Sequence, residues 1–210
     1  MRLGREALVR LVMTSTAACF FMGLGGSSAR SNRSLWEESV SNAVSARLVA
    51  QRCGFQDTEL AYTVGLVQNM GHVVMDRFLV QERDEILGRV DDGCSALQAE
   101  MDVLGMTHAE IGARMARRWG FPNVLVEAIR SHHDPAHARR DQDLCSAISV
   151  AEALTWWLLG DEGTRALCYG VSGNTVDALE ISLQELRGMI EASPGELERN
   201  RDLLGIEGED

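Results

Sequence analysis

The 210-residue sequence contains no lysine, so all 20 of its basic side chains are arginine. A phosphate-binding loop of the Walker type and a Schiff-base mechanism both need a lysine, so both are excluded. The five cysteines are scattered singly, without a Cys-x-x-Cys pair, which argues against a disulfide framework and a zinc knuckle. This cysteine usage favours a reducing compartment, and we expect a cytoplasmic location.

Strand signals are nearly absent. The sequence has no run of β-branched residues with a period of two, and no Asn-Gly or Asp-Gly hairpin lies between such runs. Its apolar residues instead recur at helical spacing between glycines and capping residues. We therefore predict an all-α bundle of roughly eight to ten short helices.

Basic residues are also fewer than acidic ones, 20 against 31, so the net charge is -11 and the isoelectric point is near 4.9. This balance disfavours a broad phosphate-binding surface as a global property. The first 52 residues carry a net charge of +4, which leaves -15 for the rest. This segment and the cluster Arg114, Arg117 and Arg118 suggest a nucleic-acid-associated regulator as one hypothesis. Arginines on an outward helix face are more often solvated surface, so we expect no nucleic-acid role.

The first 29 residues allow two interpretations. Three arginines, the apolar run Leu11 to Leu24 and the small residues 27–29 imitate a signal peptide. The run is too short and too interrupted to span a bilayer, so we expect no membrane segment. The alternative is an amphipathic helix, whose inward residues would be Leu8, Leu11, Val12, Ser15, Cys19 and Phe20.

The most informative stretch runs from Met106 to Pro135. Thr107 and Glu110 have the spacing of a capping box, so a helix should begin at His108, with an inward stripe of Ile111, Met115 and Trp119. Gly120 should end it, and Pro122 should open a second helix that ends at Ser131. Antiparallel packing of the two helices would bring His108 to His132 and His133. Three converging imidazoles are typical of a metal site, although a histidine at a helix C-terminus is also favoured by the helix dipole.

The remaining helices are predicted from capping residues and apolar stripes. Gln81 to Gly93 is expected to be a loop with one helical turn, and an acidic tail from Glu196 is expected to fray. The four tryptophans should be core or boundary residues, and His72 and His137 surface residues. The predicted helices cover residues 35–52, 58–70, 72–80, 96–104, 144–158 and 175–192.

Five segments together resemble the HDOD family, a bacterial branch of the HD-domain superfamily. They are LWEES (35–39), GLVQNMGH (65–72), LGMTHAEIGARMARRWGFP (104–122), EAIRSHHDP (127–135) and SVAEAL (149–154). The resemblance spans roughly residues 1–190 and implies an HD-like multi-helix bundle. It also favours a helix over a signal peptide at the N-terminus, because residues 3–21 look like the family's helix before this core.

The resemblance also shows two departures. Metal-dependent HD phosphohydrolases bind metal through a histidine, an adjacent His-Asp pair and a later aspartate, and the matching positions here are Glu38, Gln68, Asn69 and Glu152. Neutral amides are poor substitutes for imidazole and carboxylate on a divalent metal. Family members also usually carry several helices before the one that opens here. A shortened member, a misplaced start and one half of a split gene are the alternatives.

We therefore expect an HDOD-like domain over residues 1–190, lacking the family's N-terminal helices, followed by an acidic tail over 191–210. Its function would be that of a non-catalytic signalling module in bacterial signal transduction, with protein partners or a small regulatory ligand. A homodimer through an exposed patch near Leu8, Leu11, Val12 and Phe20 is a further expectation. We expect no catalytic residue, metal or cofactor, and a vestigial pocket formed by Glu38, Gln68, Asn69, His108, His132, His133 and Glu152. The alternative is a divergent metal-dependent phosphohydrolase or phosphodiesterase that uses His108, His132, His133, Glu152 and Glu38.

Overall fold

The computed structural model describes residues 14–21, 29–159 and 173–204, and within them the chain is helical without a strand. This confirms the all-α prediction. None of the described helices is long and apolar enough to cross a membrane. Besides a helical segment at residues 14–21, the helices are α2 (Ala29–Arg52), α3 (Thr58–Val67), α4 (Met70–Phe78), α5 (Val80–Asp91), α6 (Ala96–Leu104), α7 (His108–Arg118), α8 (Asn123–Ser131), α9 (Gln142–Leu158), α11 (Gly173–Ala178) and α12 (Leu183–Leu204), with a 3₁₀ turn η1 at Pro135–His137.

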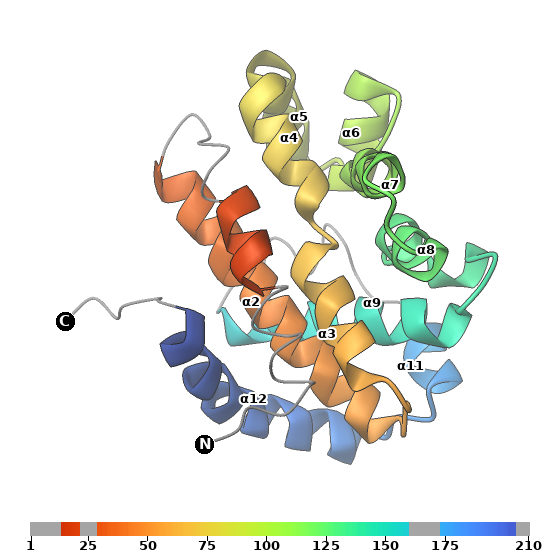
Figure 1. Ribbon diagram of the computed structural model, residues 1–210. Helices are drawn as coiled ribbons and strands as arrows, with labels where there is room; N and C mark the ends of the chain where they lie inside the picture. The colour runs from red at the N-terminus through yellow and green to blue at the C-terminus, as the bar shows by residue number, and fades with distance from the viewer. Residues whose placement is uncertain (1–13, 22–28, 160–172, 205–210) are drawn as a thin grey trace.

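Helix α2 is the central element of the bundle. It packs along α3 and α9, and α12 lies across its C-terminal half (Figure 1). The hydroxyl of Thr155 on α9 donates a hydrogen bond of 3.0 Å to the hydroxyl of Ser45 on α2 inside this packing. Two apolar clusters surround α2: one joins it to α9 and α12, and the other joins it to α3, α7 and α8.

The predicted helix ends in the central stretch are confirmed. The Thr107 hydroxyl accepts the backbone N–H of Glu110 at 3.3 Å, and the Glu110 carboxylate accepts the backbone N–H of Thr107 at 3.1 Å. Gly120 has a φ of 75°, the left-handed conformation that ends a helix. Asp57 caps α3 by accepting the N–H of Leu60 at 2.9 Å. His108 is thus the first residue of α7, and His132 follows the last residue of α8.

The buried face of α7 differs from the predicted stripe. Its buried residues are His108, Ala109, Gly112, Ala113 and Ala116, whereas Ile111 and Met115 are half-buried and Trp119 is exposed. Small residues face inward because α4 approaches α7 closely. A methyl group at Gly112 would lie 3.1 Å from Ile129 and 3.2 Å from Met70.

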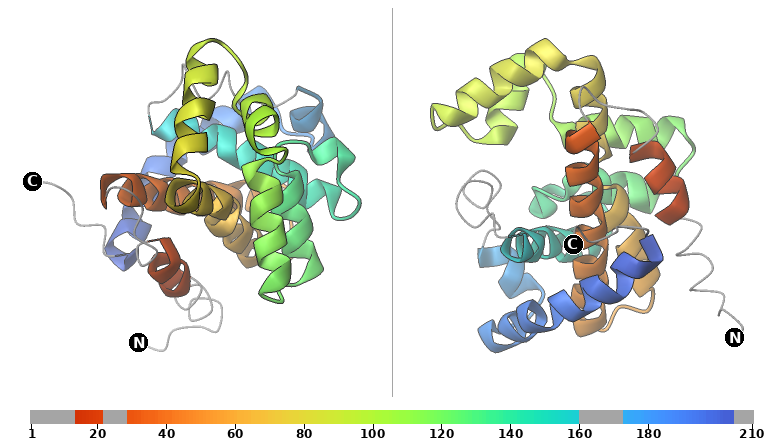
Figure 2. Two further views of the ribbon diagram at one scale, coloured as in Figure 1. Left: turned by 90° about the horizontal axis from the view of Figure 1, so that it is seen from above. Right: turned by 90° about the vertical axis from the view of Figure 1, so that its left-hand side faces the viewer.

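A helical pair, α5 and α6, projects from the bundle at the top of Figure 1 and in the right-hand view of Figure 2. The expectation of a loop over 81–93 was therefore wrong, because that segment is almost wholly within α5. We call this pair of helices, α5 and α6, the arm. A small apolar cluster joins it to α4, with Met75 of α4, Ile86 of α5 and Ala99 of α6 at its centre. Ile86 is the buried residue of α5, and the other apolar residues of this helix are half-buried or exposed.

Three further expectations need correction. In the helical residues 14–21, Thr14, Ala17 and Phe21 are buried while Ser15 and Cys19 are exposed, because Thr14 hydrogen-bonds to Tyr62 and Phe21 packs on Trp36. Helix α2 begins at Ala29, before the predicted start at residue 35. The expected helix 175–192 is two helices, separated near Glu180, whose φ is 53°.

Helix α12 continues through Pro194 to Leu204, into the segment expected to be an acidic tail. Of the residues expected to form an N-terminal patch, Leu8, Leu11 and Val12 lie outside the described residues.

Candidate functional site

Helix α4 packs against His108 and fixes its position. Gly71 faces the backbone of His108 so closely that any Cβ at residue 71 would overlap the His108 carbonyl oxygen. His72 follows Gly71, and its ring stacks on the ring of His108 with a centroid distance of 3.9 Å and an interplanar angle of 19°. The sequence-based expectation that His72 is a surface residue was therefore wrong: it is half-buried against the site.

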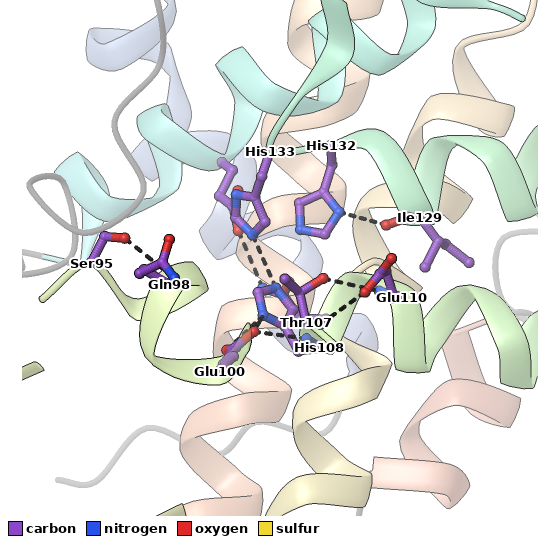
Figure 3. Close-up of polar contacts among 11 residues, drawn as sticks. Ser95, Gln98, Glu100, Thr107, His108, Glu110, Ile129, His132 and His133 are labelled. Carbon is purple, nitrogen blue, oxygen red and sulfur yellow. Dashed lines mark hydrogen bonds and ion pairs between the residues drawn. The ribbon is translucent and has the colours of Figure 1, made fainter. Parts of the chain in front are cut away.

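His108 is held by Glu100 of α6. The Glu100 carboxylate accepts the backbone N–H of His108 at 2.8 Å and lies 2.9 Å from Nδ1 of its ring (Figure 3). Both side chains are buried, with exposed fractions of 0% and 2%. Burial lowers the pKa of His108 to about 3 and raises the pKa of Glu100. The imidazole is therefore neutral at pH 7.

The other two imidazoles enter from the end of α8. Nδ1 of His132 lies 2.7 Å from the carbonyl oxygen of Ile129, and Nε2 of His132 is buried without a hydrogen-bond partner. Nε2 of His133 lies 2.9 Å from Nε2 of His108, and Nδ1 of His133 lies 3.3 Å from a carboxylate oxygen of Glu152. Burial lowers the pKa of His132 to about 3 and the pKa of His133 well below its usual value, so both rings are neutral. Figure 3 shows the three rings turned toward one another.

A second group of polar side chains lies beside the imidazoles. The amide nitrogen of Asn69 donates to Glu38 at 3.0 Å and to Glu152 at 3.4 Å, and all three residues are buried. An amide N–H can join two carboxylates that an aspartate at this position would repel. Asn69 thus presents a donor between the two acids, where a bridging metal ion would need a ligand. The set Glu38, Gln68, Asn69 and Glu152 does not fit the metal centre of an HD hydrolase.

Gln68 is separate from this group. Its side chain is 1% exposed, and neither its amide nitrogen nor its amide oxygen has a hydrogen-bond partner. An unsatisfied buried amide costs about 1–3 kcal/mol. Gln68 thus lies buried and unsatisfied at a position that the family resemblance matches to a metal ligand.

A cavity of about 440 Å³ opens onto the second group. Its polar end is formed by Glu38, Asn69, His72, Glu100 and Glu152, and its apolar wall comes from the arm, chiefly Ile86, Leu87 and Val90. Arg83 and Asp76 also line the cavity, and Nη1 of Arg83 lies 3.6 Å from Oδ1 of Asp76. The polar end is rich in carboxylates, so the cavity favours neutral or cationic ligands over phosphates.

The structure brings six of the seven predicted pocket residues into one connected set. His108, His132 and His133 form one half, Glu38, Asn69 and Glu152 form the other, and His133 contacts Glu152 between them. Gln68 makes no hydrogen bond to this set. Sequence reasoning missed His72 and Glu100. A signal for Glu100 exists, since it occupies an inward position of a short helix beside Ala99.

Comparisons with known proteins agree with this architecture. The family model for the HDOD domain matches residues 1–135. An uncharacterized protein of Treponema pallidum is 29% identical over 134 residues, which are 61% of this chain and 26% of that protein. The chain thus spans about a quarter of the length of this relative.

Three solved structures share the fold. An HDOD domain protein from Geobacter sulfurreducens superimposes with a TM-score of 0.70 and 23% identity, over 95% of this chain and 67% of that one. A protein from Marinobacter aquaeolei that is named as a signal transduction protein superimposes with a TM-score of 0.65 and 21% identity. The match covers 81% of this chain and 39% of that one. A protein from Shewanella amazonensis that is named as a phosphohydrolase superimposes with a TM-score of 0.64 and 19% identity. The match covers 95% of this chain and 85% of that one. With its family-model match over more than half its length, the chain belongs to the HDOD domain family.

Proposed function

We propose that this chain is a non-catalytic HDOD module that acts in signal transduction by binding, through protein contacts or through a small ligand in the 440 Å³ cavity. The observation that supports this most directly is the Asn69 amide, which donates to Glu38 and Glu152 at 3.0 and 3.4 Å. Hydrolysis of a phosphate ester on this fold depends on a metal ion that lowers the pKa of a water and neutralises phosphoryl charge. The residues at the bridging position do not support such an ion.

The signalling role rests on family membership and on the name of the Marinobacter aquaeolei protein. Cavity chemistry narrows the ligand class, since Glu38, Glu100 and Glu152 at its polar end disfavour a phosphorylated messenger. A neutral or cationic organic molecule with an apolar portion would match both ends of the cavity.

The alternative, a divergent phosphohydrolase, is favoured by one observation: the three imidazoles and Glu152 are in place. The name of the Shewanella amazonensis protein points in the same direction. Hydrolysis assays separate the two proposals. The protein, preincubated in turn with Mn²⁺, Fe²⁺ and Zn²⁺, is offered bis(p-nitrophenyl) phosphate and a cyclic dinucleotide.

We expect no turnover above that of the free metal ion. The matched control is the variant Glu152→Gln, which removes a carboxylate from the same set. Turnover by the wild-type protein that this variant abolishes would contradict the non-catalytic proposal and establish the hydrolase.

A further inference from the structure

The residues that line the cavity between α2, α4, α9 and the arm carry charge of mainly one sign. Among the described lining residues, one is an arginine, Arg83, and it pairs with Asp76 and Asp84. A pocket lined by one sign of charge concentrates ligands of the opposite sign, so this cavity favours cations and disfavours phosphates. The acidic lining residues are Glu38, Asp76, Asp91, Glu100 and Glu152.

Asn69 provides an independent indication of a ligand. Its side chain lines the cavity and is 3% exposed. Carboxylates only accept, so the amide nitrogen must face Glu38 and Glu152, to which it donates at 3.0 and 3.4 Å. The amide oxygen Oδ1 is then the remaining acceptor, and it is buried without a hydrogen-bond partner. A buried acceptor without a donor is unfavourable, and an N–H group of a ligand would satisfy it.

We propose that this cavity binds an organic molecule that has a primary ammonium group and a short apolar tail. An ammonium group has three N–H donors and no acceptor, and the polar end offers acceptors on Glu38, Glu152 and Asn69. A carboxylate accepts several hydrogen bonds, so both acids can bind the ammonium while they hold Asn69. This inference rests on the proposed function, because it names the ligand class of the same cavity.

The opposite wall determines the rest of the ligand. Ile86, Leu87 and Val90 of α5 give an apolar surface for the tail, and Trp156 of α9 adds an aromatic surface that a cation can contact. A volume of about 440 Å³ suits a small molecule. A polyamine fits less well, because its second charge would lie against the apolar wall beside Arg83.

The first test compares probes on the full wild-type chain by calorimetric titration at pH 7, with a chelator present to remove metal ions. Phenethylamine is the probe with a primary ammonium, and we expect a Kd below about 1 mM. The neutral isostere 2-phenylethanol and the quaternary phenethyltrimethylammonium should each bind at least ~10-fold more weakly, because the first lacks the charge and the second lacks the N–H donors. The anion 3-phenylpropionate should not bind. Absence of phenethylamine binding, or equal binding of the amine and the alcohol, would overturn the proposal.

The second test uses three variants whose folding is checked by circular dichroism. Glu38→Gln should weaken phenethylamine binding at least ~10-fold and leave 2-phenylethanol binding unchanged. Leu87→Ser, at a position 53% exposed, should weaken both probes. The matched control is Glu191→Gln, an exposed residue of α12 that makes the same change in charge and should bind as the wild type does. Equal effects of Glu38→Gln and Glu191→Gln would show attraction by net charge alone and overturn the site. If Glu38→Gln fails to fold, Leu87→Ser and the probe series still decide.

The failure of this inference can be told apart from the failure of the proposed function. No amine binding together with no hydrolysis would overturn the ammonium ligand and leave the non-catalytic module in place. Hydrolysis that Glu152→Gln abolishes would overturn the module whatever the result with phenethylamine.

Discussion

Gly71 lies directly against the carbonyl oxygen of His108, with no room for a Cβ atom between α4 and α7. We expect Gly71→Ala to lower the free energy of unfolding by about 1–3 kcal/mol, because the first turn of α7 must move. Gly88→Ala is the matched control, since a methyl group at this helical position meets nothing within 4 Å. It should stabilise the protein by about 0.5–1 kcal/mol. Urea denaturation of both variants checks the pair, and equal effects would contradict the close packing.

Asn69→Asp tests the amide bridge between Glu38 and Glu152. The new carboxylate would be buried beside two others, so its pKa in the folded protein should rise above its unfolded value. Stability should therefore fall by about 3 kcal/mol at pH 7 and recover as pH drops below the raised pKa. The control Asn123→Asp changes an exposed residue at the start of α8, where a negative charge is favourable. A variant of Asn69 with wild-type stability at pH 7 would show that the three side chains are not packed together.

The buried imidazoles predict acid sensitivity. His108 and His132 have a pKa of about 3 in the folded protein against about 6.5 when unfolded, so the unfolded chain binds more protons between these values. The stability they provide is complete above pH 6.5 and is lost progressively as pH falls toward 3. Urea denaturation from pH 7 to pH 4, with metal-free protein, measures the slope. His108→Gln should reduce it and His137→Gln should not; identical slopes in the two variants would contradict the assignment.

Two tryptophans should differ sharply in their effect on stability. Trp36 is 4% exposed and packs on Phe21, whereas Trp157 is 55% exposed. Trp36→Ala should cost about 3–5 kcal/mol and Trp157→Ala less than about 1 kcal/mol. Thermal and chemical denaturation, together with tryptophan fluorescence, give both values. A large cost at Trp157 would mean that a partner surface or second copy covers it.

The local features of the fold were predictable because they depend on neighbouring residues. The Thr107 capping box and the stop at Gly120 each involve groups within a few positions of one another. The convergence of His108 with His132 and His133 followed from the same reasoning, since two helices joined by a short turn must pack antiparallel. These predictions needed no knowledge of the rest of the chain.

The errors come from packing between distant segments. Nothing near Gly112 in the sequence shows that α4 presses on α7, so the apolar stripe looked like the inward face. Glu100 is buried and His72 is half-buried by partners on other helices, and their polar side chains look like surface in isolation. The homodimer expected through the N-terminal patch stays a prediction. Phe20, its described member, is half-buried against Phe21 and Trp119.

Helix α4 packs against both the arm and the imidazole cluster. Met75 is at the centre of the apolar cluster of α5 and α6, and Gly71, one turn earlier on α4, supports His108. A rigid turn of helix transmits displacement along its length, and Gly71 leaves no slack at its end. A displacement of the α5–α6 pair would therefore act on the support of His108 through a single turn of α4. One turn of α4 thus connects the packing of the projecting helices to the residue that supports His108.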